Sequence, residues 1–490
     1  MLDHASCYRA LLTRDARFDG RFFTAVTTTR IYCRPICPAS PPKFENCLFM
    51  PSAAAAQAAG FRPCLRCRPE AAPELAVWRG TANTVARALR LIDEGALDES
   101  DVESLALRLG VGGRHLRRLF RHHLGAPPVA VAQTRRLLFA KALLADTALP
   151  MTEVALASGY GSLRRFNDAM RRSWDRPPSE LRRGSRPPPA SGGGGVMIRL
   201  PYQPPFDWAA LLGFLGPRCI PGVEAVEGNC YRRTIALDGR HGVVELRHAD
   251  DAAQLEALIR FPNISALGTI VSRLKRQFDL DADAAAIGVQ LSADPLLAPL
   301  VACRPGLRVP GAWEPFELAV RAILGQQISV AAATVLAGRV AASYGEPLML
   351  EDGPPPPGLG LVFPAPAALT EADPGVLRVP RARAACIAGL ASALLQQPDL
   401  LAPLLPLDET VAALCRLPGI GPWTAQYVAM RALREPDAFP SGDLGLRKAA
   451  AGPDGVPTTK QLEARAAAWR PFRAYAAIHL WFSLATGGGG

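Results

Sequence analysis

One short stretch near the C-terminal end, from Leu417 to Ala425, restricts the fold of this 490-residue chain most strongly. It runs Leu-Pro-Gly-Ile-Gly-Pro-Trp-Thr-Ala, which places Gly419 and Gly421 in one tight turn. Glycine adopts positive φ and allows close backbone approach, so the amides of such a hairpin and the helix after it can hold a phosphate. A plain helix-helix connection is the alternative. Flanking apolar residues at helical spacing predict a helix on each side: Val411, Leu414, Cys415, Ala425, Val428 and Ala429.

A carboxylate, Asp443, stands 22 residues after Gly421 and follows Pro440-Ser441-Gly442, which predicts a loop. The hairpin and this aspartate resemble the helix-hairpin-helix DNA glycosylases, in which an aspartate after the hairpin supports cleavage of the bond between base and sugar. Over residues 197 to 486 the chain is similar to the AlkA-type 3-methyladenine DNA glycosylases. Three further motifs carry this resemblance: Pro204-Pro205-Phe206-Asp207-Trp208, Arg304-Pro305-Gly306-Leu307-Arg308 and Ala476-Ala477-Ile478-His479-Leu480-Trp481.

The resemblance gives Asp443 a chemical role. Cleavage of a glycosidic bond passes through an oxocarbenium-like state, and a carboxylate against the sugar stabilises that charge and can orient the attacking water. The base must leave the helical stack to be reached, and a cationic alkylated purine is held well by aromatic faces. Such aromatics are otherwise ordinary core residues. The candidate base pocket consists of Trp423, Tyr427, Trp481 and Phe482.

The family pattern also implies where DNA is contacted. The hairpin contributes Gly419, Gly421 and Thr424, and a base-flipping loop, Gly325-Gln326-Gln327-Ile328-Ser329, contributes Gln326 and Gln327. This chain departs from the relatives at one position in the flipping loop and one in the base pocket. Gln327 stands where a leucine wedge is expected, and Phe482 stands where a tyrosine is expected.

Two features of other superfamily members, a lysine nucleophile after the hairpin and a C-terminal cysteine cluster, are missing from this sequence. Members that also cut the DNA backbone carry a lysine nucleophile where this chain has Trp423, so no Schiff base is expected. The last cysteine is Cys415, so we expect no C-terminal iron-sulfur cluster. The glycosylase is therefore predicted to be monofunctional.

The charge distribution divides the chain in two. The net charge is +11, and residues 1–186 hold 29 Lys and Arg against 17 Asp and Glu, so the basic excess lies in the first part. A basic excess attracts nucleic acid in a salt-dependent way. A solvated basic surface is the alternative.

No apolar run approaches the roughly 20 residues that span a bilayer, and none follows Met1. We therefore expect a cytoplasmic, nucleoid-associated protein without a membrane partner. In a reducing compartment, its eleven cysteines are expected to be metal ligands or core residues rather than disulfides.

Four cysteines form two close pairs, Cys33-x3-Cys37 and Cys64-x2-Cys67. This spacing predicts tetrahedral thiolate coordination of one Zn²⁺, and a purely structural knot is the alternative. With Ile31-Tyr32-Cys33-Arg34-Pro35 and Gly60-Phe61-Arg62-Pro63-Cys64-Leu65-Arg66-Cys67, the region resembles the N-terminal domain of the Ada adaptive-response family. The resemblance implies that Cys33 accepts a methyl group from a methyl phosphotriester in DNA, so the zinc is both structural and reactive.

Residues 81–183 have a helical pattern with two candidate helix-turn-helix units. On the helix from Arg114 to His123 the basic residues Arg114, Arg117, Arg118 and Arg121 share one face, although a solvated charged face is the common alternative. Val154 to Ser162, followed by Arg164 and Arg165, resembles the second half of an AraC-type DNA-binding domain. The resemblance implies promoter DNA and RNA polymerase as partners.

The expected fold is multidomain and mainly α with α+β parts. Low-complexity residues near Gly192–Gly195 predict a flexible tether, Gly487–Gly490 a frayed tail, and Tyr231–Leu237 with Val243–Leu246 a β-hairpin around Asp238-Gly239. The expected domains are a zinc domain at 1–78, a helix-turn-helix domain at 81–183, a linker at 184–196, an α+β subdomain at 197–285 and a glycosylase bundle at 286–486.

The sequence thus predicts a DNA alkylation-response protein that joins a methylphosphotriester sensor and transcriptional regulator to a glycosylase for alkylated purines. The Pro-Cys-His-Arg signature of alkylguanine transferases is absent from the sequence. The main alternative is a damage-responsive transcription factor whose C-terminal half only binds damaged bases.

Overall fold

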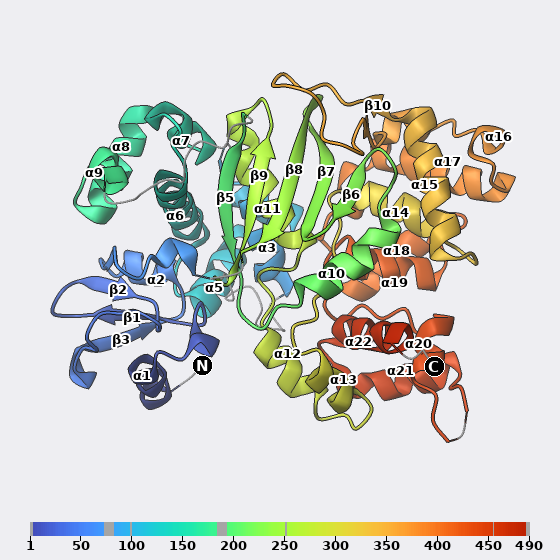
Figure 1. Cartoon of the computed structure of the whole chain (residues 1–490). Coiled ribbons are helices and arrows are strands. Elements are labelled where there is room, and N and C mark those ends of the chain that lie inside the picture. Colours follow the sequence, from blue (N-terminus) through green and yellow to red (C-terminus); the bar gives the residue numbers. More distant parts are fainter. Residues whose placement is uncertain are drawn as a thin grey trace. The chain divides into compact units, whose positions relative to one another are not determined.

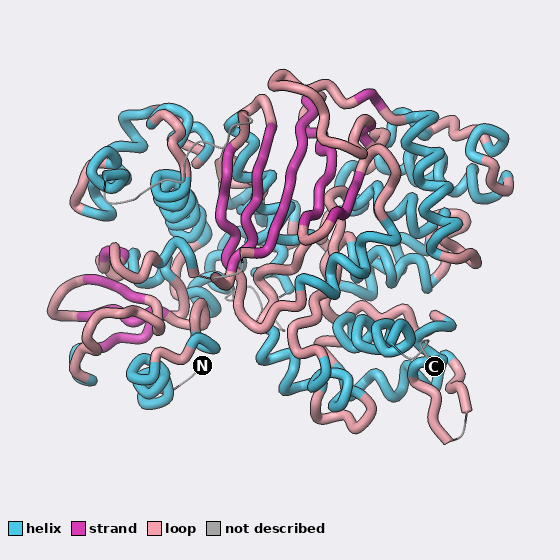
Figure 2. Tube along the Cα trace, in the orientation of Figure 1, coloured by secondary structure: helices cyan, strands magenta, loops and turns pink. Residues whose placement is uncertain are grey.

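The computed structural model describes residues 3–72, 83–98, 100–183, 194–249, 252–453 and 455–486 (Figure 1). Helices make up most of the described chain, as the sequence predicted (Figure 2). Residues 184–193 of the expected linker lie outside the described residues. The expected tail, Gly487–Gly490, lies outside them as well. Two compact units form: unit 1 is Met1–Pro204, Ala249–Lys275 and Leu280–Ala282, and unit 2 is Pro205–His248, Arg276–Asp279 and Asp283–Gly490.

Unit 1 begins with a small α/β region. Helices α1 (His4–Thr13) and α2 (Ala53–Ala58) accompany a sheet of order β3-β1-β2-β4, formed by β3 (Cys47–Met50), β1 (Phe23–Val26), β2 (Ile31–Cys33) and β4 (Arg62–Pro63). Strands β2 and β4 are parallel, with Tyr32 opposite Pro63. Because the next residues are Cys33 and Cys64, this register brings the two cysteine pairs to the same sheet edge.

Two helix-turn-helix repeats follow, as predicted. The first is α4 (Val102–Arg108) and α5 (Gly113–Leu124), and the second is α7 (Met151–Ala157) and α8 (Leu163–Trp174). Both turns contain a glycine of positive φ, Gly110 and Gly159. Both second helices bury residues three, seven and eleven positions after their start: Leu116, Phe120 and Leu124 in α5, and Phe166, Met170 and Trp174 in α8. The other helices here are α3 (Asn83–Asp93), α6 (Pro128–Asp146) and α9 (Pro178–Arg183).

The rest of unit 1 comes from later in the chain. Strand β5 (Val196–Pro201) pairs antiparallel with β9 (Gln254–Arg260), and α11 (Leu267–Gln277) follows. In unit 2, β7 (Cys230–Leu237) pairs antiparallel with both β6 (Glu224–Glu227) and β8 (Arg240–His248). The predicted hairpin around Asp238-Gly239 is confirmed with longer strands, and both turn residues have positive φ.

Unit 2 is otherwise mainly helical. Its elements are α10 (Trp208–Leu215), α12 (Ala284–Leu291), α13 (Leu297–Cys303), α14 (Pro315–Leu324), α15 (Val330–Tyr344), β10 (Glu346–Pro347), β11 (Leu361–Val362), α16 (Pro374–Leu377), α17 (Arg381–Gln396), α18 (Leu407–Cys415), α19 (Pro422–Arg431), α20 (Leu444–Ala449), α21 (Thr459–Ala466) and α22 (Arg473–Thr486). A core containing the fully buried Ile323, Ile387 and Leu390 packs α14 against α17. Within the described residues, no helix has the length and apolar character needed to cross a membrane.

The predicted hairpin lies between α18 and α19. Gly419 has φ 88°, and a Cβ there would lie 2.8 Å from the sulfur of Cys386, so only glycine fits. A Cβ on Gly421, the residue before α19, would meet no atom within 4 Å, so this side of the turn is open. Cys415, counted above among the apolar residues of α18, is exposed instead.

Candidate metal centre and base pocket

The four predicted metal ligands come together in unit 1. The Sγ atoms of Cys33, Cys37, Cys64 and Cys67 all lie within 4.8 Å of one another. A tetrahedral Zn²⁺ with bonds of about 2.3 Å to sulfur separates its ligand atoms by about 3.8 Å. This set of donor atoms therefore fits one zinc ion, and Ile31 and Ala39 pack against the cluster.

The four cysteines are not equivalent. Cys33 is half-buried, whereas Cys37, Cys64 and Cys67 are buried. The backbone N–H of Arg34 donates to the Sγ of Cys67 at 3.3 Å, and the Arg34 side chain pairs with Asp19. Cys33 is therefore the most accessible of the four sulfur donors.

Neighbours of the ligands are bonded to α6. The Gln57 amide donates to the Tyr32 hydroxyl at 3.0 Å and accepts from Thr134 at 3.1 Å. Arg68, which follows Cys67, pairs with Asp146 at 3.2 Å. Two polar routes therefore run from residues next to Cys33 and Cys67 to the helix that connects the two helix-turn-helix repeats.

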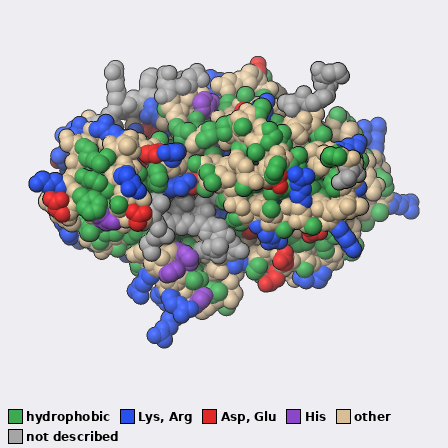
Figure 3. Space-filling model, turned by 90° about the horizontal axis from the view of Figure 1, so that it is seen from below, with side chains coloured by type: hydrophobic (Ala, Val, Ile, Leu, Met, Phe, Trp, Pro, Cys, Tyr) green, Lys and Arg blue, Asp and Glu red, His purple; other side chains and the backbone are tan. Residues whose placement is uncertain are grey.

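The candidate DNA-contacting arginines differ in their availability. Arg117 is half-buried and pairs with Glu103 at 2.8 Å. Helix α8 also exposes two arginines that the sequence reasoning missed, Arg171 and Arg172, although their spacing from Arg164 repeats that of Arg121 and His122 from Arg114. On the face shown in Figure 3, Lys and Arg side chains stand in several separate groups. The exposed predicted arginines are Arg114, Arg118, Arg121, Arg164 and Arg165.

In unit 2, Asp443 caps the start of α20 and is held by three N–H donors. Its Oδ1 accepts from the backbone of Leu446 at 2.9 Å and from the indole of Trp481 at 3.0 Å, and its Oδ2 accepts from the indole of Trp423 at 3.0 Å. A Cβ on Gly445 would lie 3.0 Å from Oδ1, so this glycine leaves room for the carboxylate. The half-buried carboxylate is thus fixed in direction but accessible.

The predicted pocket aromatics gather beside this carboxylate. Trp423 and Tyr427 stack with ring centroids 5.3 Å apart and planes 13° apart, and Trp481 meets Tyr427 edge-on at 6.2 Å. Phe482 lies 6.4 Å from Phe214, a residue of α10 that the sequence reasoning did not include. Helices α10, α19 and α22 therefore all contribute aromatic rings.

Two arginines that the sequence reasoning also missed border the pocket. The guanidinium carbons of Arg218 and Arg431 lie 3.8 and 4.9 Å from the Phe214 ring centroid. Arg431 donates to the Tyr427 hydroxyl at 2.6 Å. Burial alone would raise the pKa of Tyr427, but Arg431 and Arg218 outweigh it and lower this pKa. The only signal in the sequence was an arginine within or just after an otherwise apolar helix.

The candidate flipping loop touches the hairpin. The Gln326 amide nitrogen donates to the Gly419 carbonyl and to the Thr424 hydroxyl, both at 3.0 Å. Gln327 is exposed and has φ 59°, a left-handed conformation that is uncommon outside glycine. Gln327 is therefore not packed in the core.

Comparison with known proteins gives a family that matches this geometry. Three family models match in sequence: the metal binding domain of Ada over residues 6–70, a helix-turn-helix domain over 105–184 and the AlkA N-terminal domain over 197–314. A protein of Mycobacterium tuberculosis described as a probable bifunctional transcriptional activator/DNA repair enzyme AlkA is 43% identical over 98% of this chain and 97% of its own length. The chain belongs to this AlkA family.

Two further relatives match about three fifths of the AlkA-family chain. DNA-3-methyladenine glycosylase 2 of Escherichia coli is 35% identical over 59% of this chain and 97% of its own length. The structure of a 3-methyladenine DNA-glycosylase from Archaeoglobus fulgidus covers 60% of this chain and 99% of that one, with a TM-score of 0.52 at 23% identity. That likeness establishes a glycosylase-like fold, and the Ada-type domain with its cysteine cluster establishes a zinc-binding region.

Proposed function

We propose that this AlkA-family chain excises alkylated purines of the 3-methyladenine type from double-stranded DNA, with Asp443 as the catalytic carboxylate. The observation that carries the proposal is the arrangement around Asp443. Three N–H donors orient its oxygens, and two of these donors are indoles of the aromatic pocket. The indoles of Trp423 and Trp481 thus both donate to the carboxylate and form part of the aromatic wall of the pocket. A base held against this wall therefore places its sugar near Asp443.

In this reaction, the DNA backbone binds at the open amide side of Gly421 and the start of α19. The damaged nucleotide is extruded, Gln327 enters the vacated stack, and the base is held against Trp423, Tyr427, Trp481 and Phe482. The bond from C1′ to the base nitrogen breaks, and its electron pair leaves with the base. Asp443 stabilises the positive sugar and orients water, which adds to C1′ and loses a proton. Trp423 replaces the lysine of backbone-cutting relatives, so the enzyme is monofunctional.

The second activity belongs to the cysteine cluster. We propose that one zinc ion is held by Cys33, Cys37, Cys64 and Cys67 and that the chain holds no iron-sulfur cluster. Bound zinc keeps the thiolates deprotonated at neutral pH. The Cys33 sulfur attacks the methyl carbon of a methyl phosphotriester, the carbon–oxygen bond breaks, and a phosphodiester anion leaves. This transfer is stoichiometric, because the S-methyl thioether that it leaves on Cys33 is a stable product.

Methylation removes one negative charge from the cluster, which strengthens binding to DNA. The contacts that Tyr32 and Arg68 make toward α6 provide a route to the helix-turn-helix repeats. We propose that these repeats, through the arginines of α5 and α8, bind promoter DNA and recruit RNA polymerase at the nucleoid. The domains assigned to these roles are 1–78, 81–183, the linker 184–196, 197–285 and 286–486.

The test uses methylated duplex DNA with the full chain and its Asp443→Asn variant, and quantifies free bases. Asparagine is a good helix cap, so the variant is expected to fold. We expect release by the wild type and a loss of roughly 10²- to 10⁴-fold in the variant. Equal release by the wild type and the variant would show that Asp443 is not the catalytic carboxylate. No release by the wild type would favour a regulator that only binds damaged bases.

A further inference from the structure

Arg218 places a guanidinium beside the base pocket. Its Nη1 donates to the carbonyl of Phe214 at 2.8 Å, and its carbon lies 3.8 Å from that ring centroid. Among the residues that the structure describes, Arg218 forms no ion pair. Burial lowers the pKa of Arg218 to about 10; Tyr427 opposes this shift, whereas Arg431 and Arg321 add to it, and the group stays charged at neutral pH.

A buried network fixes the backbone of Arg218. Glu224 accepts from Arg321 at 2.7 Å, and Glu317 accepts from Arg233 at 2.7 Å and from Arg321 at 3.2 Å. Arg321 also donates to the carbonyl of Arg218. The two carboxylates are matched by the two guanidiniums within the network, which leaves no negative charge over for Arg218.

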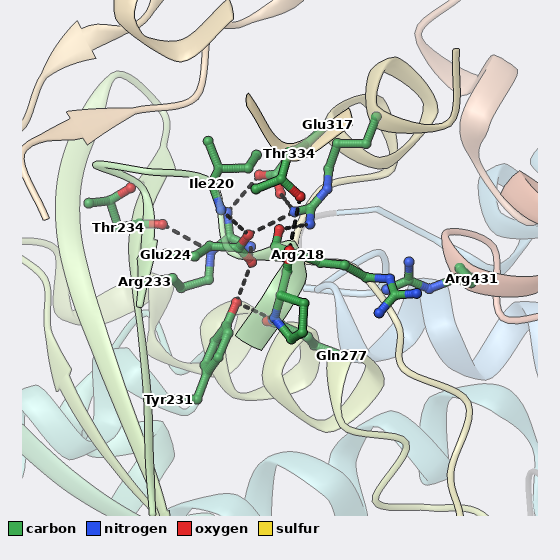
Figure 4. A network of polar contacts seen from close by, with 12 residues as sticks. Arg218, Ile220, Glu224, Tyr231, Arg233, Thr234, Gln277, Glu317, Thr334 and Arg431 are labelled. Carbon is green, nitrogen blue, oxygen red and sulfur yellow. Dashed lines mark hydrogen bonds and ion pairs between the residues drawn. The ribbon is translucent and has the colours of Figure 1, made fainter. Parts of the chain in front are cut away.

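The Arg218 side chain points away from this network. Figure 4 shows it extending toward Arg431, which is itself hydrogen bonded to Tyr427 and to the carbonyls of Pro310 and Gly311. Each of the three nitrogens of Arg431 therefore donates a hydrogen bond. Four of the five N–H groups of Arg218, in contrast, have no acceptor among the described residues. Among the described residues, Arg218 is thus a cation beside the pocket with donors available to a ligand.

Glycosidic cleavage makes the base one unit more negative, whichever base leaves. A cationic alkylated base leaves neutral, and a neutral base leaves as an anion that then takes a proton from water. A fixed cation beside the base favours both changes, just as a carboxylate beside the sugar favours the opposite change there. We propose that Arg218 contacts the extruded base and stabilises the negative charge that this base gains as the bond breaks. This role rests on the proposed glycosylase function.

The charge of Arg218 has a specific kinetic signature. With a cationic substrate, it repels the bound base before cleavage, so its removal is expected to lower both the single-turnover rate constant and the half-saturating enzyme concentration. With a neutral substrate, its removal is expected to lower the rate constant alone. A residue that only supports Phe214 would lower the rate for both substrates by one factor, without tighter binding of the cationic one.

The experiment compares the wild type with Arg218→Met and Arg218→Lys on two duplexes, one with a single 7-methylguanine and one with a single hypoxanthine. For Arg218→Met we expect a rate loss of roughly 10- to 100-fold on both, and tighter binding by about tenfold for 7-methylguanine only. Arg218→Lys keeps the charge and should restore most of both parameters. Arg304→Met is the matched control, because Arg304 lies 5.7 Å from the Phe482 ring centroid but is neutralised by Asp207.

A rate for Arg218→Met equal to that of the wild type, or a loss without tighter binding of the 7-methylguanine duplex, would overturn the proposal. If hypoxanthine is released too slowly to measure, the rate and binding measured with the 7-methylguanine duplex alone test the proposal. Failure of the wild type to release any base would instead contradict the proposed function, so the two failures are distinguishable.

Discussion

The cysteine cluster and the base pocket are built in opposite ways. The cluster takes four identical donor atoms from two short segments, 33–37 and 64–67, in a region of short strands. The pocket takes its side chains from α10, α19, α22 and the start of α20, between Phe214 and Phe482, on helices that pack a large apolar core. In the first region the metal site stabilises the fold, whereas in the second the packed helices position the site. Loss of a ligand should therefore unfold one region, and loss of a pocket residue should only slow the other.

The largest expected effect is on the cluster. Structural zinc contributes roughly 10 kcal/mol or more to folding in small metal domains, so Cys64→Ala or zinc removal should unfold residues 3–72. Hydrogen exchange of β1–β4 peptides measures this, with α19 peptides of unit 2 as the internal control. Unchanged protection of the strands without zinc would show that the small sheet is stable by its own packing and does not depend on the metal.

A smaller effect is expected from Trp481→Phe in the pocket. The change removes one N–H donor from Asp443 but keeps an aromatic ring, so the single-turnover rate should fall roughly 10- to 100-fold with little loss of stability. Trp469→Phe is the matched control, because its indole donates to Asp294 at 2.8 Å in the same unit. That variant should lose stability rather than rate. Equal effects of the two variants would show that the indole of Trp481 serves only packing.

The smallest expected effect is a pH dependence of unit 2. Burial lowers the pKa of His479, on α22, to about 4. Because the unfolded chain has the higher pKa, about 6.5, it binds more protons as the pH falls, and stability is lost between pH 6.5 and 4. The loss from pH 7 to 5.5 is about 1 kcal/mol. Urea unfolding monitored by exchange of α22 should detect it, and His479→Gln should flatten the profile. An unchanged profile in that variant would assign the dependence to other groups.

The same contrast explains what could be predicted from the sequence. The two cysteine pairs predict their own cluster, because both segments are short and only the strand register between β2 and β4 remained to be found. The helix-turn-helix repeats were likewise visible in local periodicity. In the pocket, Asp443 and the aromatics of α19 and α22 came from motifs. Phe214 lies about 200 residues earlier, in a helix that looks like ordinary core, and Arg218 lies in the short turn that follows this helix. Only tertiary packing brings them to Tyr427.

We propose that one chain carries both a single-use methyl acceptor and a multiple-turnover glycosylase. The most direct test incubates limiting protein with excess methylated DNA and counts, per chain, both free bases and methyl groups on Cys33. We expect methylation to stop at one per chain and base release to pass well beyond one, with Cys33→Ala abolishing only the first and Asp443→Asn only the second. Base release that stops at one per chain would contradict a multiple-turnover enzyme. Loss of both base release and methylation in either variant would contradict two separate sites.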